Sequence, residues 1–400
     1  MTNFLFVVFY GIFFFCLLGM MLVFVLYPCF LFCRLLIARN PFKSFIPISK
    51  HFPRVSIITV SHKADTLLDE KVKNIQQLDY PHHLLEFIFF SDGPSENTCD
   101  IQTRLQNIQV KQLSSKTHQG KAYGLNRAVE QSTGKILVFS DIDAIINKKA
   151  VTLLVNHFQD TAIGGVCGHR AIVKEKTSLQ SAQSRYLAFD NLIKSMEGKT
   201  GSLTSNEGKL YAIRRSLFQP IDPAATDDLY NCLSVVKAKY RFVFEPEAYM
   251  YIHSPSRSPK HEIQRRRRIV VRSLHGIAKY KELLNPVRFG WYSHGLFINK
   301  ILRRCLPVFL MGIFLSVLFL SFTSGIMLVI LILQLVFYGT ALLYPLTAWR
   351  SPSTRIGESM QKIVSLVTYF ILGNYGTLLG VIDFLTGKRI IKWTPVKLDE

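Results

Sequence analysis

An uncharged apolar run near the start of the chain restricts its possible folds more than any other feature. The run extends from Phe4 to Cys33, about thirty residues, and contains no Asp, Glu, Lys or Arg. A helix that crosses a bilayer needs about 20 apolar residues, whereas a cleaved signal peptide has a basic start and a shorter apolar core. The opening residues, MTNFLF, include no basic residue. The sequence therefore predicts a retained transmembrane anchor over residues 1–36.

A second apolar zone, residues 305–386, predicts further membrane helices. Leu306–Phe322 and Ile326–Leu346 have the composition of two spans. A third stretch, Ile363–Leu385, is interrupted by glycines, an asparagine and Asp383. Two arrangements remain open for it: a full span, or a broken or re-entrant helix that keeps the basic tail, residues 387–400, on the cytoplasmic side.

The distribution of charge indicates an orientation. Lys and Arg number 48 against 27 Asp and Glu, which gives a formal net charge of +21. By the positive-inside rule, the basic segments that follow the apolar runs are cytoplasmic. We therefore expect an integral, multi-pass protein of the cytoplasmic (inner) membrane with a cytoplasmic central domain. The basic residues that support this orientation are Arg34, Arg39, Lys43, Lys50, Arg54, Arg350, Arg355 and Lys362.

Two other classes of protein fit the sequence less well. Nucleic-acid binding is disfavoured because much of the positive charge lies beside the apolar runs and in one arginine run, with no recognition motif. A transporter or channel is disfavoured because the apolar segments contain almost no ionisable residue besides Asp383. Seven scattered cysteines without a CxxC pair indicate neither a zinc site nor a disulfide framework.

The region between the apolar zones has an α/β pattern. The runs typical of strands are residues 54–60, 86–92, 107–113 and 135–141, and those typical of helices are 67–81 and 120–132. Their alternation predicts an α/β fold with a mostly parallel, Rossmann-like sheet, whose ligands bind at the carboxyl ends of strands. Residues 273–304 mix basic and apolar side chains, which predicts amphipathic helices lying on the lipid bilayer.

Two carboxylates stand side by side at the end of one predicted strand. Asp141 and Asp143 follow the apolar residues Ile136–Phe139 in the sequence KILVFSDIDAII. On an extended chain they would point to the same side about 6 Å apart and repel each other by about 3 kcal/mol at an effective dielectric near 20. That repulsion must be offset. A divalent metal, a pair of arginines and open water are the three possibilities.

The order of the motifs resembles that of the membrane-bound family 2 glycosyltransferases, which include cellulose, hyaluronan and poly-N-acetylglucosamine synthases. The resemblance runs from about Val55 to Ile269 and continues loosely towards the carboxyl terminus. The motifs that carry it are FSDGPSENT with Asp92, SDIDA with Asp141 and Asp143, TDDL with Asp227 and Asp228, and EIQRRRRIVVR over Glu262–Arg272, supported by QGKAYGLNRAV and GKLYAIRRSLF.

The resemblance implies a fold and a reaction. It implies a GT-A domain over residues 50–272 that uses a nucleoside-diphosphate sugar, usually a uridine one. The sugar would pass with inversion to a lipid-linked or polysaccharide acceptor at the cytoplasmic membrane face, in cell-surface glycan or exopolysaccharide synthesis. Mg²⁺ or Mn²⁺ would be held by Asp143 and Asp141, since both ions prefer oxygen ligands. No export or assembly partner is indicated.

The resemblance also implies roles for individual residues. Asp228 would be the catalytic base, and Asp227 would orient it. Asp92 would contact the nucleotide base, and Lys121 would face the diphosphate. The remaining predicted substrate-binding residues are Asp141, Gly208, Gln264, Arg267 and Arg268. Arg268 replaces a tryptophan that lines the acceptor site in polymerising members, so processive synthesis is not implied.

Simpler roles remain open for several of these residues. Asp92 could cap the turn before Gly93. The acids Asp227 and Asp228 could stabilise a helix start. The arginine run could bind anionic lipid, and on this view Arg272 lies at the membrane surface.

Overall fold

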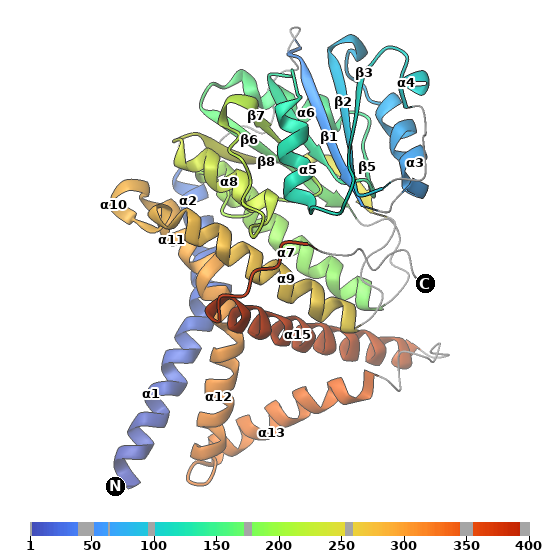
Figure 1. The fold of residues 1–400 in the computed structure, drawn as a ribbon. Coiled ribbons are helices and arrows are strands. Elements are labelled where there is room, and N and C mark those ends of the chain that lie inside the picture. The colour runs from blue at the N-terminus through green and yellow to red at the C-terminus, as the bar shows by residue number, and fades with distance from the viewer. Residues whose placement is uncertain are drawn as a thin grey trace.

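The computed structural model describes residues 2–38, 52–62, 65–94, 101–171, 178–252, 259–344 and 355–392. Arg39, Lys43, Lys50 and Arg350, which we used to predict the orientation, lie outside these ranges. An α/β domain occupies one end of the molecule, and long apolar helices extend from the other (Figure 1).

The α/β domain contains one mixed sheet with the strand order β3-β2-β1-β4-β7-β6-β8-β5. The first four strands in this order are parallel, as predicted, whereas β7 pairs antiparallel with both β4 and β6, and β5 pairs antiparallel with β8. The strands are β1 (Val55–Ser61), β2 (Leu85–Asp92), β3 (Gln109–Ser115), β4 (Ile136–Ser140), β5 (Ala144–Ile146), β6 (Ile163–Ala171), β7 (Leu210–Arg214) and β8 (Arg241–Ile252).

Helices cover both faces of the sheet, so its central strands are buried on both sides. Every residue of β1 is buried, which explains its continuous apolar run. One core layer packs the sheet against α3 and α6, and the other packs it against α5 and α8. The helices of the domain are α3 (Asp65–Gln76), α4 (Ile101–Arg104), α5 (Lys121–Glu130), α6 (Ala150–Asn156), α7 (Ser178–Thr200) and α8 (Asp227–Lys237).

Three helices in the described part of the chain are long and apolar enough to cross a membrane. They are Phe4–Ile37, Trp291–Leu320 and Ser359–Leu385, with 34, 30 and 27 residues. The first joins α1 (Thr2–Met21), a π-helical turn η1 (Leu22–Leu26) and α2 (Tyr27–Ile37), and the second ends in α12 (Leu306–Leu320). The next helix, α13 (Gly325–Thr340), is apolar but shorter.

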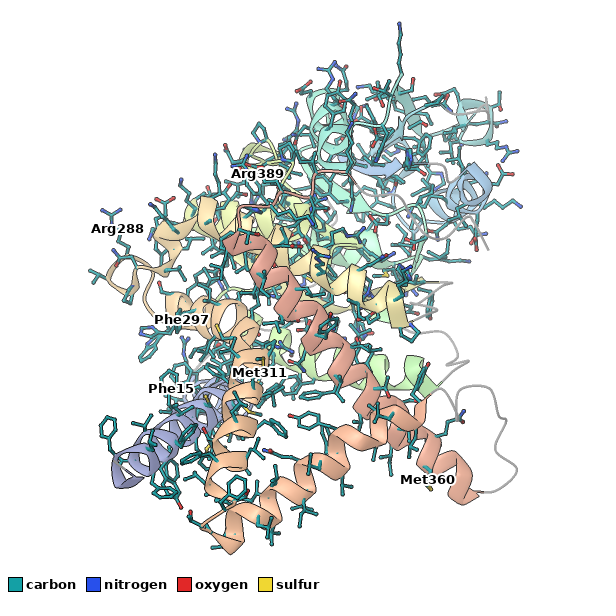
Figure 2. The ribbon with its side chains drawn as sticks, turned by 60° about the horizontal axis from the view of Figure 1, so that its bottom comes forward. Phe15, Arg288, Phe297, Met311, Met360 and Arg389 are labelled. Carbon is teal, nitrogen blue, oxygen red and sulfur yellow. The ribbon has the colours of Figure 1, made fainter. Side chains whose placement is uncertain are left out.

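Large apolar side chains on these helices face outward. Phe15 on α1 is 68% exposed and Met311 on α12 is 53% exposed, and both lie on the surface in Figure 2. Surfaces of this kind are stable in an apolar surrounding, because soluble proteins rarely expose large contiguous apolar patches.

The third apolar stretch is a single unbroken helix, α15 (Arg355–Leu385), so the expectation of a broken helix was wrong. The glycines that suggested a break are contact points. A Cβ atom on Gly376 would lie 2.9 Å from the carbonyl oxygen of Ile263, and one on Gly380 would lie 2.8 Å from that of Arg267. Close approach of α9 (Pro259–Lys279) therefore requires glycine there, and the two helices lie side by side across the direction of α1 and α12 (Figure 1).

The predicted boundary at residue 272 falls inside α9. Beyond α9 the chain forms only short helical pieces before α12. These are η5 (Lys281–Leu284), α10 (Pro286–Phe289), α11 (Trp291–Leu296), the π-helical turn η6 (Phe297–Ile301) and η7 (Leu302–Cys305).

Candidate active site

Asp141 and Asp143 lie in a tight turn between β4 and β5. The amide of Ala144 donates a hydrogen bond of 3.2 Å to the carbonyl oxygen of Asp141, so the chain is not extended here as we had assumed. The two carboxylates nevertheless meet at one cation, because Lys209 Nζ lies 3.7 Å from Asp141 Oδ2 and 2.5 Å from Asp143 Oδ1.

Helix α3 holds this turn through two polar side chains on its buried face. The fully buried Lys71 donates to Ser140 Oγ (2.6 Å) and to the carbonyl oxygen of Ala144 (2.7 Å), one residue before and one residue after the acidic segment. Asn74 exchanges two hydrogen bonds with the backbone of Ile146, of 2.8 and 2.9 Å. Burial lowers the pKa of Lys71 to about 7, although the nearby Asp141 carboxylate opposes the shift.

Two lysines, rather than two arginines, offset the acidic charge. Lys121 Nζ lies 2.8 Å from Asp141 Oδ1 and 3.1 Å from Asp227 Oδ2, so it joins the turn after β4 to the start of α8. Burial opposes its charge, but these two carboxylates raise the pKa of Lys121 above its usual value. Lys209 escaped the sequence analysis although it follows Gly208 directly, and burial lowers its pKa to about 8 while Asp141 opposes the shift.

Asp227 and Asp228 are the first two residues of α8. This position agrees with the alternative that they stabilise a helix start. Their surroundings differ. Asp227 contacts Lys121, whereas burial and the neighbouring Asp227 charge raise the pKa of Asp228 to about 6. Gly208 leaves room for Asp228, since a Cβ on that glycine would lie 3.1 Å from Asp228 Oδ2. An aspartate with this pKa can accept a proton near neutral pH.

Asp92 organises the loop that leads to Lys121. Its oxygens accept hydrogen bonds of 2.7 Å from the amides of both Gln119 and Gly120, and one of 3.2 Å from Ser115 Oγ. The side chain is 2% exposed, and His118 Nδ1 lies 2.8 Å from Oδ2. In this structure Asp92 therefore fixes the backbone beside the carboxylate cluster.

Among the residues that the structure describes, two groups of side chains could hold a metal ion. His62, Asp92 and His118 offer ligand atoms within 4.8 Å of one another, and the two imidazole rings stack with centroids 3.9 Å apart. The second group is the pair Asp141 and Asp143, whose oxygens suit Mg²⁺ or Mn²⁺. Because Lys209 already places positive charge between this pair, the donor set fits a cation.

The arginine run on α9 points in several directions. Arg265 bonds Glu262 within the same helix, and Arg267 forms a two-pronged pair with Asp383 of α15, including a 2.7 Å contact. Arg268 lies near the acidic cluster: burial and neighbouring arginines lower its pKa to about 10, and Asp141 opposes the shift. Gln264 is exposed. The Asp141 carboxylate thus acts electrostatically on Arg268, whereas the carboxylate that Arg267 contacts is that of Asp383.

Arg272 is buried, so the expectation that it lies at the membrane surface was wrong. It is 5% exposed, and its Nε donates a 3.1 Å hydrogen bond to the carbonyl oxygen of Ala225. This contact ties α9 to the segment just before Asp227. The error arose because a run of arginines does not indicate which helix face each side chain occupies.

Comparison with protein families identifies the α/β domain. Residues 56–221 match the model of glycosyl transferase family 2. This part of the chain is therefore similar to the glycosyl transferase family 2 domain. The match covers the strands that carry Asp92, Asp141 and Asp143, as well as Lys121 and Lys209.

Curated relatives are similar over about half of the chain. A probable glycosyltransferase, YdaM, of Bacillus subtilis is 27% identical over 218 residues, 52% of each chain. A beta-monoglucosyldiacylglycerol synthase of Nostoc is 23% identical over 191 residues, 46% of this chain and 41% of that protein. The chain thus spans about half the length of the curated relatives it matches.

A solved structure extends the likeness beyond the glycosyltransferase domain. The mannosyltransferase PcManGT of Pyrobaculum calidifontis, solved in complex with GDP-Man and Mn²⁺, superposes with a TM-score of 0.66. The match covers 94% of this chain and 99% of that one at 19% identity. It confirms the predicted GT-A fold, whereas membership of the cellulose, hyaluronan and poly-N-acetylglucosamine synthase group stays a prediction.

A cavity of about 660 Å³ connects the glycosyltransferase domain to the apolar helices. Asp228, Asn206 and Thr226 line its side towards the domain, and Leu306, Leu366 and Phe370 line its side towards the apolar helices. Four basic side chains also line it: Arg266, Lys300, Arg303 and Arg304. Asp228 therefore lies in the wall of a cavity whose lining also contains basic side chains and apolar side chains.

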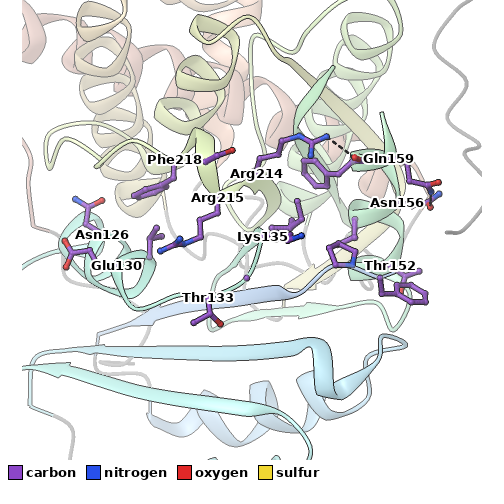
Figure 3. Close-up of a pocket in the computed structure, with 18 of the residues that line it drawn as sticks. Asn126, Glu130, Thr133, Lys135, Thr152, Asn156, Gln159, Arg214, Arg215 and Phe218 are labelled. Carbon is purple, nitrogen blue, oxygen red and sulfur yellow. Dashed lines mark hydrogen bonds between the residues drawn. The ribbon is translucent and has the colours of Figure 1, made fainter. Parts of the chain in front are cut away.

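A larger cavity, of about 850 Å³, lies at the end of β4 opposite to Asp141 (Figure 3). It is lined by residues at the start of β4 and the end of β7, including Lys135, Arg214 and Arg215. Arg214 donates to the carbonyl oxygens of Phe158, Asp160 and Ile163, so it stabilises the wall. Ligands of parallel sheets bind at the carboxyl ends of strands, which favours the surroundings of Asp141 over this cavity as the candidate active site.

Proposed function

We propose that the chain is a membrane-anchored, metal-dependent glycosyltransferase that moves a sugar from a nucleoside diphosphate to an acceptor hydroxyl with inversion. The observation that carries the proposal is the proximity of two acidic groups at one edge of a domain similar to family 2. Asp228 has a pKa raised to about 6, and the carboxylates of Asp141, Asp143 and Asp227 contact lysines. The first supplies a base, and the second supplies a place for a cation and a diphosphate.

The donor would lie across the carboxylate cluster. Asp143 and Asp141 would hold Mg²⁺ or Mn²⁺, which supplies positive charge for the departing diphosphate. Lys121 and Arg268 would add charge-assisted hydrogen bonds to its oxygens, since guanidinium and ammonium groups suit phosphate. Arg267 could join them only if its pair with Asp383 opened. The nucleotide base of the donor would lie near Asp92. We retain a uridine nucleotide sugar as the expected donor.

Asp228 would act on the acceptor. As the acceptor oxygen forms its bond to the anomeric carbon, the bond from that carbon to the diphosphate breaks, and the diphosphate leaves with the electron pair. The acceptor proton passes to Asp228. Direct displacement from the opposite face inverts the configuration. Asp227, bound to Lys121, would keep its neighbour in position.

The acceptor would reach Asp228 through the cavity of about 660 Å³. Its apolar wall fits a lipid-linked acceptor, and its polar wall fits a glycan, so both acceptor classes are retained. Basic residues after the first apolar helix support a cytoplasmic domain at an inner membrane, with the product used in cell-surface glycan or exopolysaccharide synthesis.

A panel of radiolabelled nucleotide sugars tests this proposal. Membranes that contain the full chain should transfer one label into lipid or polymer, and excess chelator should stop transfer until Mn²⁺ or Mg²⁺ is restored. Equal labelling from every nucleotide sugar of the panel, or full activity in excess chelator, would contradict the proposal. A cysteine introduced at exposed Glu130 should resist a membrane-impermeant thiol reagent in intact cells, which tests the cytoplasmic orientation separately.

A further inference from the structure

A basic cavity lies beside the first apolar helix, away from the carboxylate cluster. It has a volume of about 350 Å³ and is enclosed by α2, the end of α7, the turn before β8 and the α10–α11 segment. Four cationic side chains line it: Arg34, Lys239, Arg241 and Arg288. The mechanism proposed above uses none of them.

The one carboxylate in the lining is held inside the protein. Glu197 is 3% exposed and accepts hydrogen bonds from the Tyr27 hydroxyl (2.5 Å) and from the amide and hydroxyl of Thr204 (2.8 and 2.7 Å). Burial raises the pKa of Glu197, which disfavours its charged form. Positive charge therefore dominates the cavity.

The four cations divide into two pairs. Arg34 donates to the carbonyl oxygen of Thr200, and Arg241 donates to those of Gly198 and Gly201, so this pair stabilises the wall. Lys239 donates to the carbonyl oxygen of Arg288 (2.8 Å) and lies 3.7 Å from the centre of the Phe289 ring. Within the described residues neither Lys239 nor Arg288 forms an ion pair with a carboxylate, so both retain charge for an anion.

Exposed apolar side chains lie in and beside the lining of the cavity. Trp291, a lining residue, is 58% exposed, and Val287, which precedes the lining residue Arg288 in the chain, is 93% exposed. The lining also includes residues of α2, which continues the apolar Phe4–Ile37 segment. Tryptophan is enriched where the headgroups of a bilayer meet its hydrocarbon. Figure 2 shows Arg288 at the outer edge of the molecule, on the side opposite Met360.

We propose that this cavity binds the phosphate of an anionic phospholipid. Lys239 and Arg288 would contact the phosphate, while Trp291 and Val287 would lie against the adjoining glycerol and acyl groups. A free anion would gain only the polar contacts, whereas a lipid would also bury the exposed apolar surface. The inference rests on the membrane anchoring proposed above, but not on the sugar transfer.

The test uses the full chain in a neutral detergent, without any nucleotide sugar. Phosphatidylglycerol, phosphatidylcholine and inorganic phosphate are added separately, and the melting temperature and the number of bound lipids, by native mass spectrometry, are recorded. Only phosphatidylglycerol should raise the melting temperature and remain bound. Arg288→Gln and Lys239→Gln should each weaken its binding about fivefold, the usual contribution of one basic side chain near an anionic lipid surface.

Lys279→Gln is the matched control, because Lys279 is an exposed lysine at the end of α9 outside the cavity. It should leave phosphatidylglycerol binding unchanged. Equal losses in all three variants, an equal response to phosphatidylcholine, or no response to any lipid would overturn the proposal. If inorganic phosphate raised the melting temperature by the same amount as phosphatidylglycerol, the ligand would be a soluble phosphate and not a lipid. A chain released from membranes by carbonate would refute the anchoring itself.

Discussion

The two acidic pairs of the domain contain the same side chains in opposite electrostatic surroundings. Asp141 and Asp143, in the turn after β4, share the ammonium group of Lys209, and Asp141 also contacts Lys121. In the first turn of α8, Asp227 takes the remaining contact of Lys121, and Asp228 has a pKa raised to about 6 by burial and by its neighbour. Lys121 and Lys209 thus divide the four carboxylates into three that are paired with a cation and one that is suited to accept a proton.

The difference shows that motif identity does not fix chemical role. From the sequence, the first pair could be interpreted as metal ligands, and the second as a catalytic base with its neighbour or as acids at a helix start. Their roles separate only when the distances to the lysines are known, because a carboxylate beside a cation stays charged whereas a buried one next to another carboxylate takes up a proton more readily. Removal or change of single groups in either pair therefore tests the division directly.

The largest effect is expected at Asp228. Asp228→Asn keeps the shape and removes the basicity, so kcat should fall by about 10²- to 10⁴-fold while the donor KM stays nearly unchanged. Asp227→Asn should have a milder effect. Single-turnover rates and melting temperatures of both variants provide the measurement. A normal rate in Asp228→Asn, with stability lowered by about 1 kcal/mol or less, would support the helix-start alternative instead.

The next effect concerns the support of the first pair. Lys71→Met removes the buried ammonium group that bonds Ser140 and Ala144 on either side of Asp141 and Asp143. Loss of groups that orient metal ligands typically costs about 10- to 100-fold in metal affinity or activity, so the Mn²⁺ concentration needed for half-maximal rate should rise by that factor. Metal titration at saturating donor measures it.

Lys73→Met is the matched control, because Lys73 is an exposed lysine on the same helix. It should leave the Mn²⁺ requirement unchanged. If Lys71→Met lowered only the melting temperature, with the same Mn²⁺ requirement, Lys71 would be a structural residue without influence on the metal.

Much of the fold could be predicted from the sequence, because buried parallel strands give continuous apolar runs. The runs around β1, β2 and β4 located the strands and placed Asp92 and Asp141 near their carboxyl ends. The second half of the sheet could not be predicted, since β6, β7 and β8 pair with strands distant in the sequence. The glycines of α15 were misinterpreted because a sequence does not reveal whether a glycine breaks a helix or admits a neighbouring one.

The candidate site was predictable in its acids but not in its bases. Paired aspartates at strand and helix ends are conspicuous, whereas lysines are common on any surface. Lys71 did give a signal, because it lies on the apolar face of α3 between Leu68, Val72 and Ile75. Lys209 gave none beyond its place after Gly208, since its contact with Asp143 joins residues 66 positions apart.

A third prediction concerns pH. Asp228 must be unprotonated to act as a base, so kcat/KM should fall about tenfold per pH unit below its pKa of about 6 and level off above it. Lys209, whose ammonium group lies beside Asp141 and Asp143, loses its charge above its pKa of about 8. The positive charge available to a diphosphate at this turn then falls, so donor binding should weaken on the alkaline side. Lys209→Arg stays charged and should extend activity to higher pH. A flat profile between pH 4.5 and about 6 would contradict the assignment of Asp228.

The smallest effect compares two neighbouring arginines. Arg268 lies near Asp141, whereas Arg267 pairs with Asp383, so only Arg268 is placed to meet a donor phosphate. Arg268→Lys keeps the charge and loses the planar fork, which should cost about one hydrogen bond, or about fivefold in donor KM. Arg267→Lys should leave donor KM unchanged and weaken the contact between α9 and α15, which a lower melting temperature would reveal. The reverse pattern, with donor KM raised in Arg267→Lys alone, would mean that the pair with Asp383 opens when the donor binds and that Arg267 takes the phosphate.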